Sequence, residues 1–298
     1  MINERFKIIK AHPQGFCDGV VRAIKMTKAA LNNHTTPKPI YILGSIVHNK
    51  EISNAFRSLG LITITFDDIK NIKQGTIIIS AHGVSPSVIK TIKENNVNII
   101  DTTCKKVQFL HNLVKEKVDN GYDVLFMGKE THEETRGVLG ISDKVHLYTK
   151  NDDYSKLNKL ILVCQTTLCY NDVLKEYELI KQKYPTIEIA CEVCDATYLR
   201  QKAGLEASKD ADLVLVVGDK TSNNCNSLVK TIKEINSNCH LIEGIKDLKE
   251  ISFTNIKTIT ITSAASTPKA ITDEVIEALN NIEATDFKTK IQLLDYIK

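Results

Sequence analysis

Uninterrupted apolar runs that end in glycine occur three times along the chain. They cover residues 41–44, 124–128 and 213–218, and polar side chains do not alternate with apolar ones within them. Runs of this kind are typical of parallel strands that are covered on both faces of their sheet. The pattern therefore predicts three buried strands with helices on either side.

Each run belongs to a longer unit that repeats along the chain and begins at a cysteine. A short β-rich segment leads into a loop that carries Cys17, Cys104 or Cys194, and the run that ends in glycine follows each cysteine at a similar interval. Apolar positions recur at helical spacing after the first two cysteines, and more weakly over residues 195–209. We predict a helix after each cysteine.

A second apolar strand in each unit ends in a small polar loop, at residues 80–82, 165–167 and 263–266. Strands that alternate with helices predict an α/β protein with mainly parallel sheets. Ligands collect at the carboxyl ends of parallel strands, so three units around a pseudo-threefold axis would direct the cysteines and the loops at one centre. The expected boundaries are 1–96, 97–186 and 187–285 for the three units and 286–298 for a C-terminal tail.

Composition and charge exclude several classes of function. The 298 residues are 25% charged with a net charge of +3, and the lysines form no basic run, which argues against nucleic acid as a partner. No stretch approaches the roughly 18 apolar residues of a membrane span, and the N-terminus lacks the apolar core of a signal peptide. We expect a cytoplasmic protein with no membrane segment. In that reducing compartment the eight cysteines are better candidates for metal ligands or redox groups than for disulfides.

Three thiolates from three separate units limit the kinds of metal site. They are too few for a closed structural zinc site and one short of the usual four-cysteine complement of a [4Fe–4S] cluster. A cluster held by Cys17, Cys104 and Cys194 would leave one iron open. Because an open iron acts as a Lewis acid and a cluster delivers single electrons, this set favours reductive cleavage of a C–O bond.

Polar side chains in the loops after the strands indicate the substrate. They supply many hydrogen-bond donors and few carboxylates, which suits an oxyanion such as a diphosphate. Glu134, two residues after His132, is the carboxyl group that we expect in this pocket, where it would supply protons. The polar residues are His48, His82, His132, Thr166, Thr167, Ser222, Asn223, Asn224 and Ser266.

Seven motifs along nearly the whole chain resemble, in order, those of the 4-hydroxy-3-methylbut-2-enyl diphosphate reductase family. The resemblance implies a trefoil of three α/β units around a central [4Fe–4S] cluster. It also implies that this diphosphate is reduced to isopentenyl diphosphate and dimethylallyl diphosphate, the last step of the non-mevalonate isoprenoid pathway. The motifs cover residues 15–23, 46–49, 80–84, 101–104, 165–168, 217–224 and 266–268.

The resemblance also implies roles for residues at matching positions. Cys17, Cys104 and Cys194 match the cluster ligands, and Glu134 matches the proton donor. Electrons would come from a ferredoxin or a flavodoxin in transient contact with the enzyme. The positions that match those around the substrate are His48, His82, His132, Thr166, Ser222, Asn223, Asn224 and Ser266.

The chain departs from the family pattern at four positions, none of which removes a cluster ligand. Ser45 and Lys105 stand where proline is expected, and Ala264 stands where glycine is usual. Lys105 adds charge beside a cluster cysteine. Glu133 replaces the proline that usually precedes the acid, which leaves open which of the two adjacent glutamates points inward, although position favours Glu134.

Simpler interpretations apply to the other cysteines. Cys164, Cys225 and Cys239 are expected to be small buried side chains without a chemical role. Cys191 and Cys194 form a CxxC pair, a spacing that also occurs in redox dithiols and zinc sites. No second CxxC accompanies it in the sequence, so we expect no role for Cys191.

Two other classes of function stay open at this point. One is a hydrolase or transferase in which the cysteines bind zinc, and the other is a non-catalytic iron–sulfur carrier or redox sensor. Ser222 and Asn224 would also serve as caps of the next helix, a use that is compatible with binding a phosphate there.

Overall fold

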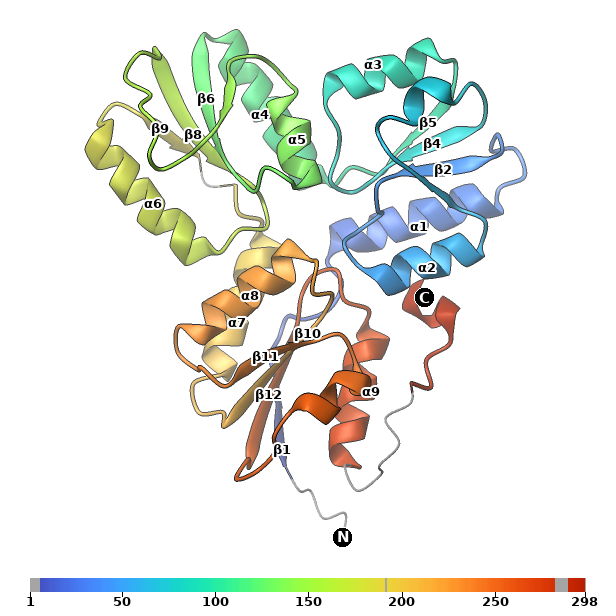
Figure 1. Cartoon of the computed structure of the whole chain (residues 1–298), viewed down its shortest axis with the longest axis vertical. Coiled ribbons are helices and arrows are strands. Elements are labelled where there is room, and N and C mark those ends of the chain that lie inside the picture. Colours follow the sequence, from blue (N-terminus) through green and yellow to red (C-terminus); the bar gives the residue numbers. More distant parts are fainter. Residues whose placement is uncertain (1–5, 191, 282–288, 298) are drawn as a thin grey trace. The chain divides into compact units, whose positions relative to one another are not determined.

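The computed structural model describes residues 6–190, 192–281 and 289–297 (Figure 1). Over these residues the chain is an α/β protein with three four-stranded sheets, and neighbouring strands are parallel throughout. The α/β fold class and the parallel sheets that the apolar pattern predicts are thereby confirmed.

One sheet follows the strand order β3-β2-β4-β5. All four residues of β4 (Thr76–Ile79) are buried, because helices cover both faces of this sheet (Figure 1). α3 (Pro86–Glu94) packs on one face through Ile92, and α1 (Asp18–Asn32) lies along the other. The remaining strands are β2 (Ile40–Leu43), β3 (Ile62–Ile64) and β5 (Asn98–Asp101).

A second sheet follows the order β7-β6-β8-β9. Successive residues of β6 (Tyr122–Met127) enter two different cores: Val124 and Phe126 pack with the α4 and α5 side, and Leu125 packs with α6. This explains why the strand reads as a continuous apolar run. The other elements are α4 (Lys105–Asp119), α5 (Glu133–Leu139), α6 (Tyr170–Lys183), β7 (Val145–Leu147), β8 (Lys159–Cys164) and β9 (Glu188–Ala190).

The third sheet follows the order β1-β12-β10-β11. Every residue of β10 (Leu213–Val217) is buried. Val214 and Val216 face α8, whereas Leu215 joins the core under α9 (Figure 1). The other elements are β1 (Lys7–Lys10), β11 (Cys239–Ile242), β12 (Thr258–Ser263), α7 (Asp195–Ala207), α8 (Asn223–Lys233), α9 (Lys269–Asn280) and the 3₁₀ segment η2 (Ile245–Glu250).

The first strand of each sequence repeat pairs with a strand of a different repeat. β5 lies after the expected boundary at residue 97 but pairs with β4, and β9 pairs with β8. β1, the first strand of the chain, pairs with β12 near the other end of the sequence. Each leading strand therefore completes a sheet that is built by another repeat.

The helix after Cys194 forms despite its weak apolar spacing. Its buried face consists of Thr197, Arg200, Gln201 and Gly204 rather than of large apolar residues. Because these buried side chains are mostly polar, the helix shows little hydrophobic periodicity in the sequence. The remaining elements are α2 (Lys50–Ser58) and the 3₁₀ segments η1 (Ile69–Asn71) and η3 (Leu293–Ile297).

The chain divides into two compact units. The first contains residues 1–18, 48–55 and 195–298 and includes the sheet built on β10. The second contains residues 19–47 and 56–194 and includes the other two sheets. The threefold division at residues 96 and 186 stays a prediction. Among the described residues, no helix is both long enough and apolar enough to cross a membrane.

Candidate functional site

The three predicted cluster cysteines occupy equivalent places in the fold. Each directly precedes a helix, because α1 begins at Asp18, α4 at Lys105 and α7 at Asp195. Each also donates its backbone N–H to a carbonyl in the polar loop after a neighbouring strand. These hydrogen bonds join Cys17 to Ala265 at 3.2 Å, Cys104 to Ala81 at 3.0 Å and Cys194 to Thr166 at 2.9 Å. Each cysteine loop is therefore tied to a polar loop of another sequence repeat, and not to the polar loop of its own repeat.

Exposure separates these three cysteines from the others that the structure describes. Cys17, Cys104 and Cys194 are partly exposed. Burial raises the pKa of the Cys225 thiol to about 11 and that of Cys239 to about 12, so neither supplies a thiolate near neutral pH. Cys164 and Cys169 are buried as well, whereas Cys191 lies outside the described residues.

The donor chemistry of the three partly exposed cysteines fits an iron–sulfur cluster. Iron in such clusters is bound by cysteine thiolates, which must be accessible to the metal. Cys17, Cys104 and Cys194 meet this condition, and each directly precedes a helix, whose first-turn N–H groups attract negative charge.

Glu134 is a buried acid on the first turn of α5. Its side chain is 1% exposed, and Thr166 donates to it twice, from the backbone N–H at 2.7 Å and from Oγ1 at 2.8 Å. His132 caps the same helix by accepting the Glu134 N–H at Nδ1, at 3.2 Å. Burial raises the pKa of Glu134 and outweighs the hydrogen bonds from Thr166 and the charge of His82, which act in the opposite direction. An acid of this kind retains its proton at higher pH than an exposed glutamate.

Glu133, the neighbouring acid, points to a different partner. Its Oε2 lies 2.8 Å from Nδ1 of His82, in the loop after β4. The rings of His82 and His132 meet edge to face, with 5.5 Å between their centroids. The second compact unit thus brings together His82, His132, Glu133, Glu134 and Thr166.

The first compact unit gathers the predicted residues of the last repeat at the start of α8. Ser222 caps this helix by accepting the N–H of Cys225 at 3.4 Å, and its Oγ lies 3.5 Å from that of Ser266. Asn223 and Asn224 occupy the first turn and are buried. Hydroxyl and amide groups around a helix N-terminus suit a phosphate, because the helix directs N–H groups and its positive dipole end toward it.

His48 belongs to the same unit and directly precedes an Asn49 cap. Oδ1 of Asn49 accepts the N–H groups of Glu51 and Ile52, both at 3.1 Å, at the start of α2. His48 is partly buried. The structure therefore places it at the beginning of a helix, as it does for His132 on α5 and Ser222 on α8.

Arg200 is a buried residue that the sequence analysis does not identify. It is 5% exposed and reaches from α7 to the loop before Cys17, where its guanidinium donates to the carbonyl oxygen of Gly15 at 2.8 and 3.2 Å. It also donates to the carbonyl oxygen of Ala196 at 2.8 Å. The only sequence signal is an arginine in the weakly patterned helix, which does not indicate a partner near residue 15.

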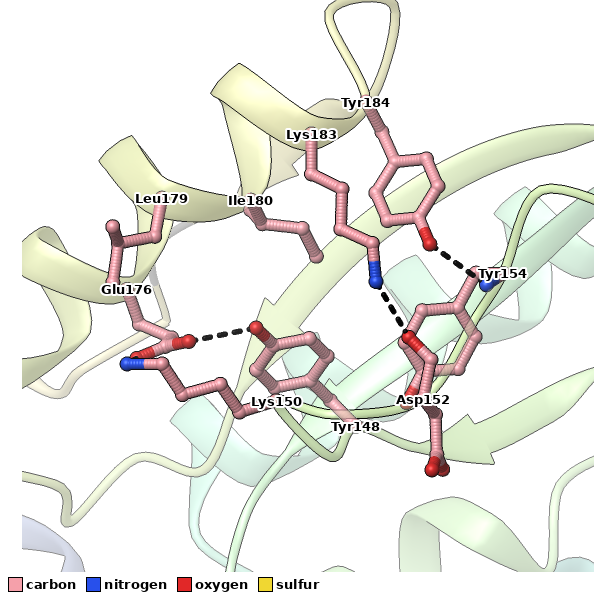
Figure 2. Close-up of a pocket in the computed structure, with 9 residues that line it drawn as sticks. All are labelled: Tyr148, Lys150, Asp152, Tyr154, Glu176, Leu179, Ile180, Lys183 and Tyr184. Atoms are coloured by element: carbon pink, nitrogen blue, oxygen red, sulfur yellow. Dashed lines mark hydrogen bonds and ion pairs between the residues drawn. The ribbon is translucent and has the colours of Figure 1, made fainter.

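A separate cavity of about 180 Å³ lies between α6 and the loop that follows β7 (Figure 2). Its polar groups bind one another: Tyr148 donates to Glu176 at 2.7 Å, the Tyr184 hydroxyl accepts the Tyr154 N–H at 2.8 Å, and Lys183 donates to the Asp152 carbonyl at 2.8 Å. No residue of the predicted site lines it. These contacts hold the loop on α6.

Comparisons with known proteins show which proteins this chain is similar to. The family model described as LytB protein matches residues 8–280. The chain is 42% identical to 4-hydroxy-3-methylbut-2-enyl diphosphate reductase of Bacillus pumilus over 95% of the chain and 93% of that protein. It is 40% identical to the reductase of the same name from Bacillus subtilis, again over 95% and 93%.

A solved structure extends the similarity to the fold. The E-1-hydroxy-2-methyl-but-2-enyl-4-diphosphate reductase of Plasmodium falciparum superimposes with a TM-score of 0.85 and 32% sequence identity. The match covers 97% of this chain and 91% of that one.

Proposed function

Because the chain belongs to the LytB family of 4-hydroxy-3-methylbut-2-enyl diphosphate reductases, which are oxidoreductases, we propose that it converts this diphosphate to isopentenyl diphosphate and dimethylallyl diphosphate. This reaction would be the last step of the non-mevalonate pathway. The observation that carries the proposal is the set of three partly exposed cysteines, each at a helix start and each tied to a polar loop.

We assign a [4Fe–4S] cluster to Cys17, Cys104 and Cys194. When bound, such a cluster supplies single electrons and a Lewis-acidic iron. Electrons would reach it from a ferredoxin or flavodoxin in transient contact. The cytoplasm is the proposed compartment, because the three thiols must stay reduced to bind iron.

The chain's own residues would bind and orient the substrate. The start of α8 offers hydroxyl and amide donors to the diphosphate, and at about 1.5–3 kcal/mol for each hydrogen bond to a charged group a few such contacts suffice. The histidines and Thr166 would surround the rest of the molecule. The proposed substrate-binding residues are His48, His82, His132, Thr166, Ser222, Asn223, Asn224 and Ser266.

Glu134 is the proposed proton donor. Breaking the C–O bond expels a hydroxide equivalent, which leaves far more easily when an acid protonates it. The raised pKa of Glu134 keeps the proton available, and the two hydrogen bonds from Thr166 fix the orientation of its carboxyl group. Water is kept from this carboxyl group, which is 1% exposed.

A single-turnover assay tests the proposal. Anaerobically purified protein is reduced with dithionite, mixed with the allylic diphosphate and quenched, and the products are identified by mass spectrometry. We expect the two five-carbon diphosphates without the hydroxyl group. Iron and sulfide in the protein with no conversion of the substrate would instead support a carrier, and bound zinc without sulfide would support a hydrolase or transferase.

A further inference from the structure

Glu133 contacts His82, a partner that could not be predicted from the sequence. It is the first residue of α5, and its Oε2 lies 2.8 Å from Nδ1 of His82, which lies in the loop after β4. The side chains are 23% and 14% exposed, so the pair is largely shielded from water. Both residues belong to the second compact unit.

A glycine makes room for this carboxylate. Gly44 ends the run over β2 with φ of +71°, and a Cβ at that position would lie 2.3 Å from Oε1 of Glu133. Any larger residue would therefore displace the carboxylate, besides being strained by the positive φ. Three segments that are distant in sequence thus meet at the Glu133 carboxyl group: the end of β2, the loop after β4 and the start of α5.

The contact selects one form of the His82 ring. Nδ1 lies 2.8 Å from the Glu133 carboxylate and 3.3 Å from the Ser80 hydroxyl. Hydrogen bonds to a carboxylate are shorter and roughly twice as strong as those between neutral groups, so the Nδ1–H donates to Glu133. The other ring nitrogen, Nε2, then accepts a hydrogen bond when the ring is neutral and donates one when it is protonated.

From this geometry we propose that Glu133 is a positioning residue, whose carboxylate fixes the ring orientation and the Nδ1–H form of His82 so that Nε2 faces the substrate. The inference rests on the proposed function, in which His82 contacts the substrate. It assigns a role to one of the four departures from the family pattern, because a proline at position 133 has no carboxylate to offer. Glu133 itself does not transfer a proton.

The test combines a spectroscopic signature with steady-state kinetics. The full-length protein is purified anaerobically with ¹⁵N-labelled histidine, and the His82 ring nitrogens are assigned with His82→Gln. In the unsubstituted chain we expect a signal from a protonated Nδ1. Glu133→Ala should move both ring-nitrogen signals and raise KM about 10-fold, with kcat changed less than about 3-fold.

Two further variants test whether the effect is specific to the hydrogen bond between Glu133 and His82. Glu133→Gln should recover most of the KM, because the amide oxygen still accepts from Nδ1–H. Glu130→Ala is the matched control, since Glu130 is an exposed acid in the loop directly before α5, and it should leave both the nitrogen signals and KM unchanged.

The possible failures can be distinguished. Unchanged His82 signals in Glu133→Ala would overturn the inference whether or not the protein is a reductase, because that measurement needs no substrate. Signals that move with no change in KM would also overturn it, since His82 would then be oriented without effect on the substrate. Absence of turnover in the unsubstituted chain would contradict the proposed function itself and, with it, the role of His82.

Discussion

Two adjacent glutamates on α5 have different surroundings, and this difference governs their chemistry. Glu134 is buried against Thr166, whereas Glu133 stays partly exposed and contacts His82. The sequence favours Glu134 as the inward acid by position alone. It does not reveal the partner of Glu133, because that contact joins the start of α5 to a loop far away in the chain and needs the space beside Gly44.

The first prediction concerns Glu134 as a proton donor. Glu134→Gln keeps the size and polarity of the side chain but removes the transferable proton, so kcat should fall by about 10²–10⁴ while the substrate still binds. Steady-state kinetics and an equilibrium binding measurement check the two parts. Glu130→Gln is the control and should keep full activity, and loss of activity in both variants would contradict a specific role for Glu134.

The second prediction uses the raised pKa of Glu134. A pKa raised above its usual value of 4.5 means that the protonated group stabilises the folded chain fully below pH 4.5. This contribution is lost as the pH rises through the pKa of the folded state. Relative to Glu134→Gln, the free energy of unfolding of the unsubstituted chain should therefore decrease as the pH rises above about 4.5. Urea unfolding of both cluster-free chains measures it, and a difference that is independent of pH would contradict the raised pKa.

At the scale of single elements, helix starts carry most of the candidate site. The repeat register places His48, His132 and Ser222 at the same interval after an apolar run, but the sequence pattern indicates a helix start only at Ser222 and Asn224. The structure places these three residues next to α2, α5 and α8. The polar face of α7 could not be predicted in this way, since Arg200 on this face donates to backbone carbonyls, and such contacts leave no mark on hydrophobic spacing.

The third prediction concerns Arg200 on α7. Its guanidinium holds the carbonyl of Gly15, two residues before Cys17, and is almost fully buried. Arg200→Gln should lower the free energy of unfolding by about 2–4 kcal/mol, because charged hydrogen bonds are lost and carbonyl groups are left without donors. Urea unfolding measures this loss. Lys202→Gln, an exposed change on the same helix, should cost less than about 0.5 kcal/mol, and equal effects of the two changes would contradict the role of Arg200.

At the scale of the whole molecule, the local pattern of apolar residues predicts that the sheets are parallel. It does not predict which strands belong to which sheet. The apolar runs predict parallel strands with helices on both faces, and the structure confirms this. They do not predict that β1 pairs with β12, because a strand of four residues carries no information about a partner near the other end of the chain. The sequence repeats and the sheets therefore have different boundaries.

The pairing of β1 with β12 matters for the candidate cluster. It places the loop with Cys17 beside the loop after β12, where Gly15 donates its N–H to Ser263 Oγ at 2.9 Å and Cys17 donates to Ala265. The loop that carries Cys17 is thus held in place by a segment from near the other end of the sequence. The corresponding loops of Cys104 and Cys194 are built in the second unit from β4 with β5 and from β8 with β9.

The central claim is that these three cysteines, and no others, hold the iron–sulfur cluster. Its most direct test is the iron and acid-labile sulfide content of anaerobically purified chains with single serine substitutions. The unsubstituted chain and Cys164→Ser should each contain about four iron and four sulfide ions per chain, whereas Cys17→Ser, Cys104→Ser and Cys194→Ser should lose most of both. A full complement of iron and sulfide in Cys104→Ser would contradict the claim.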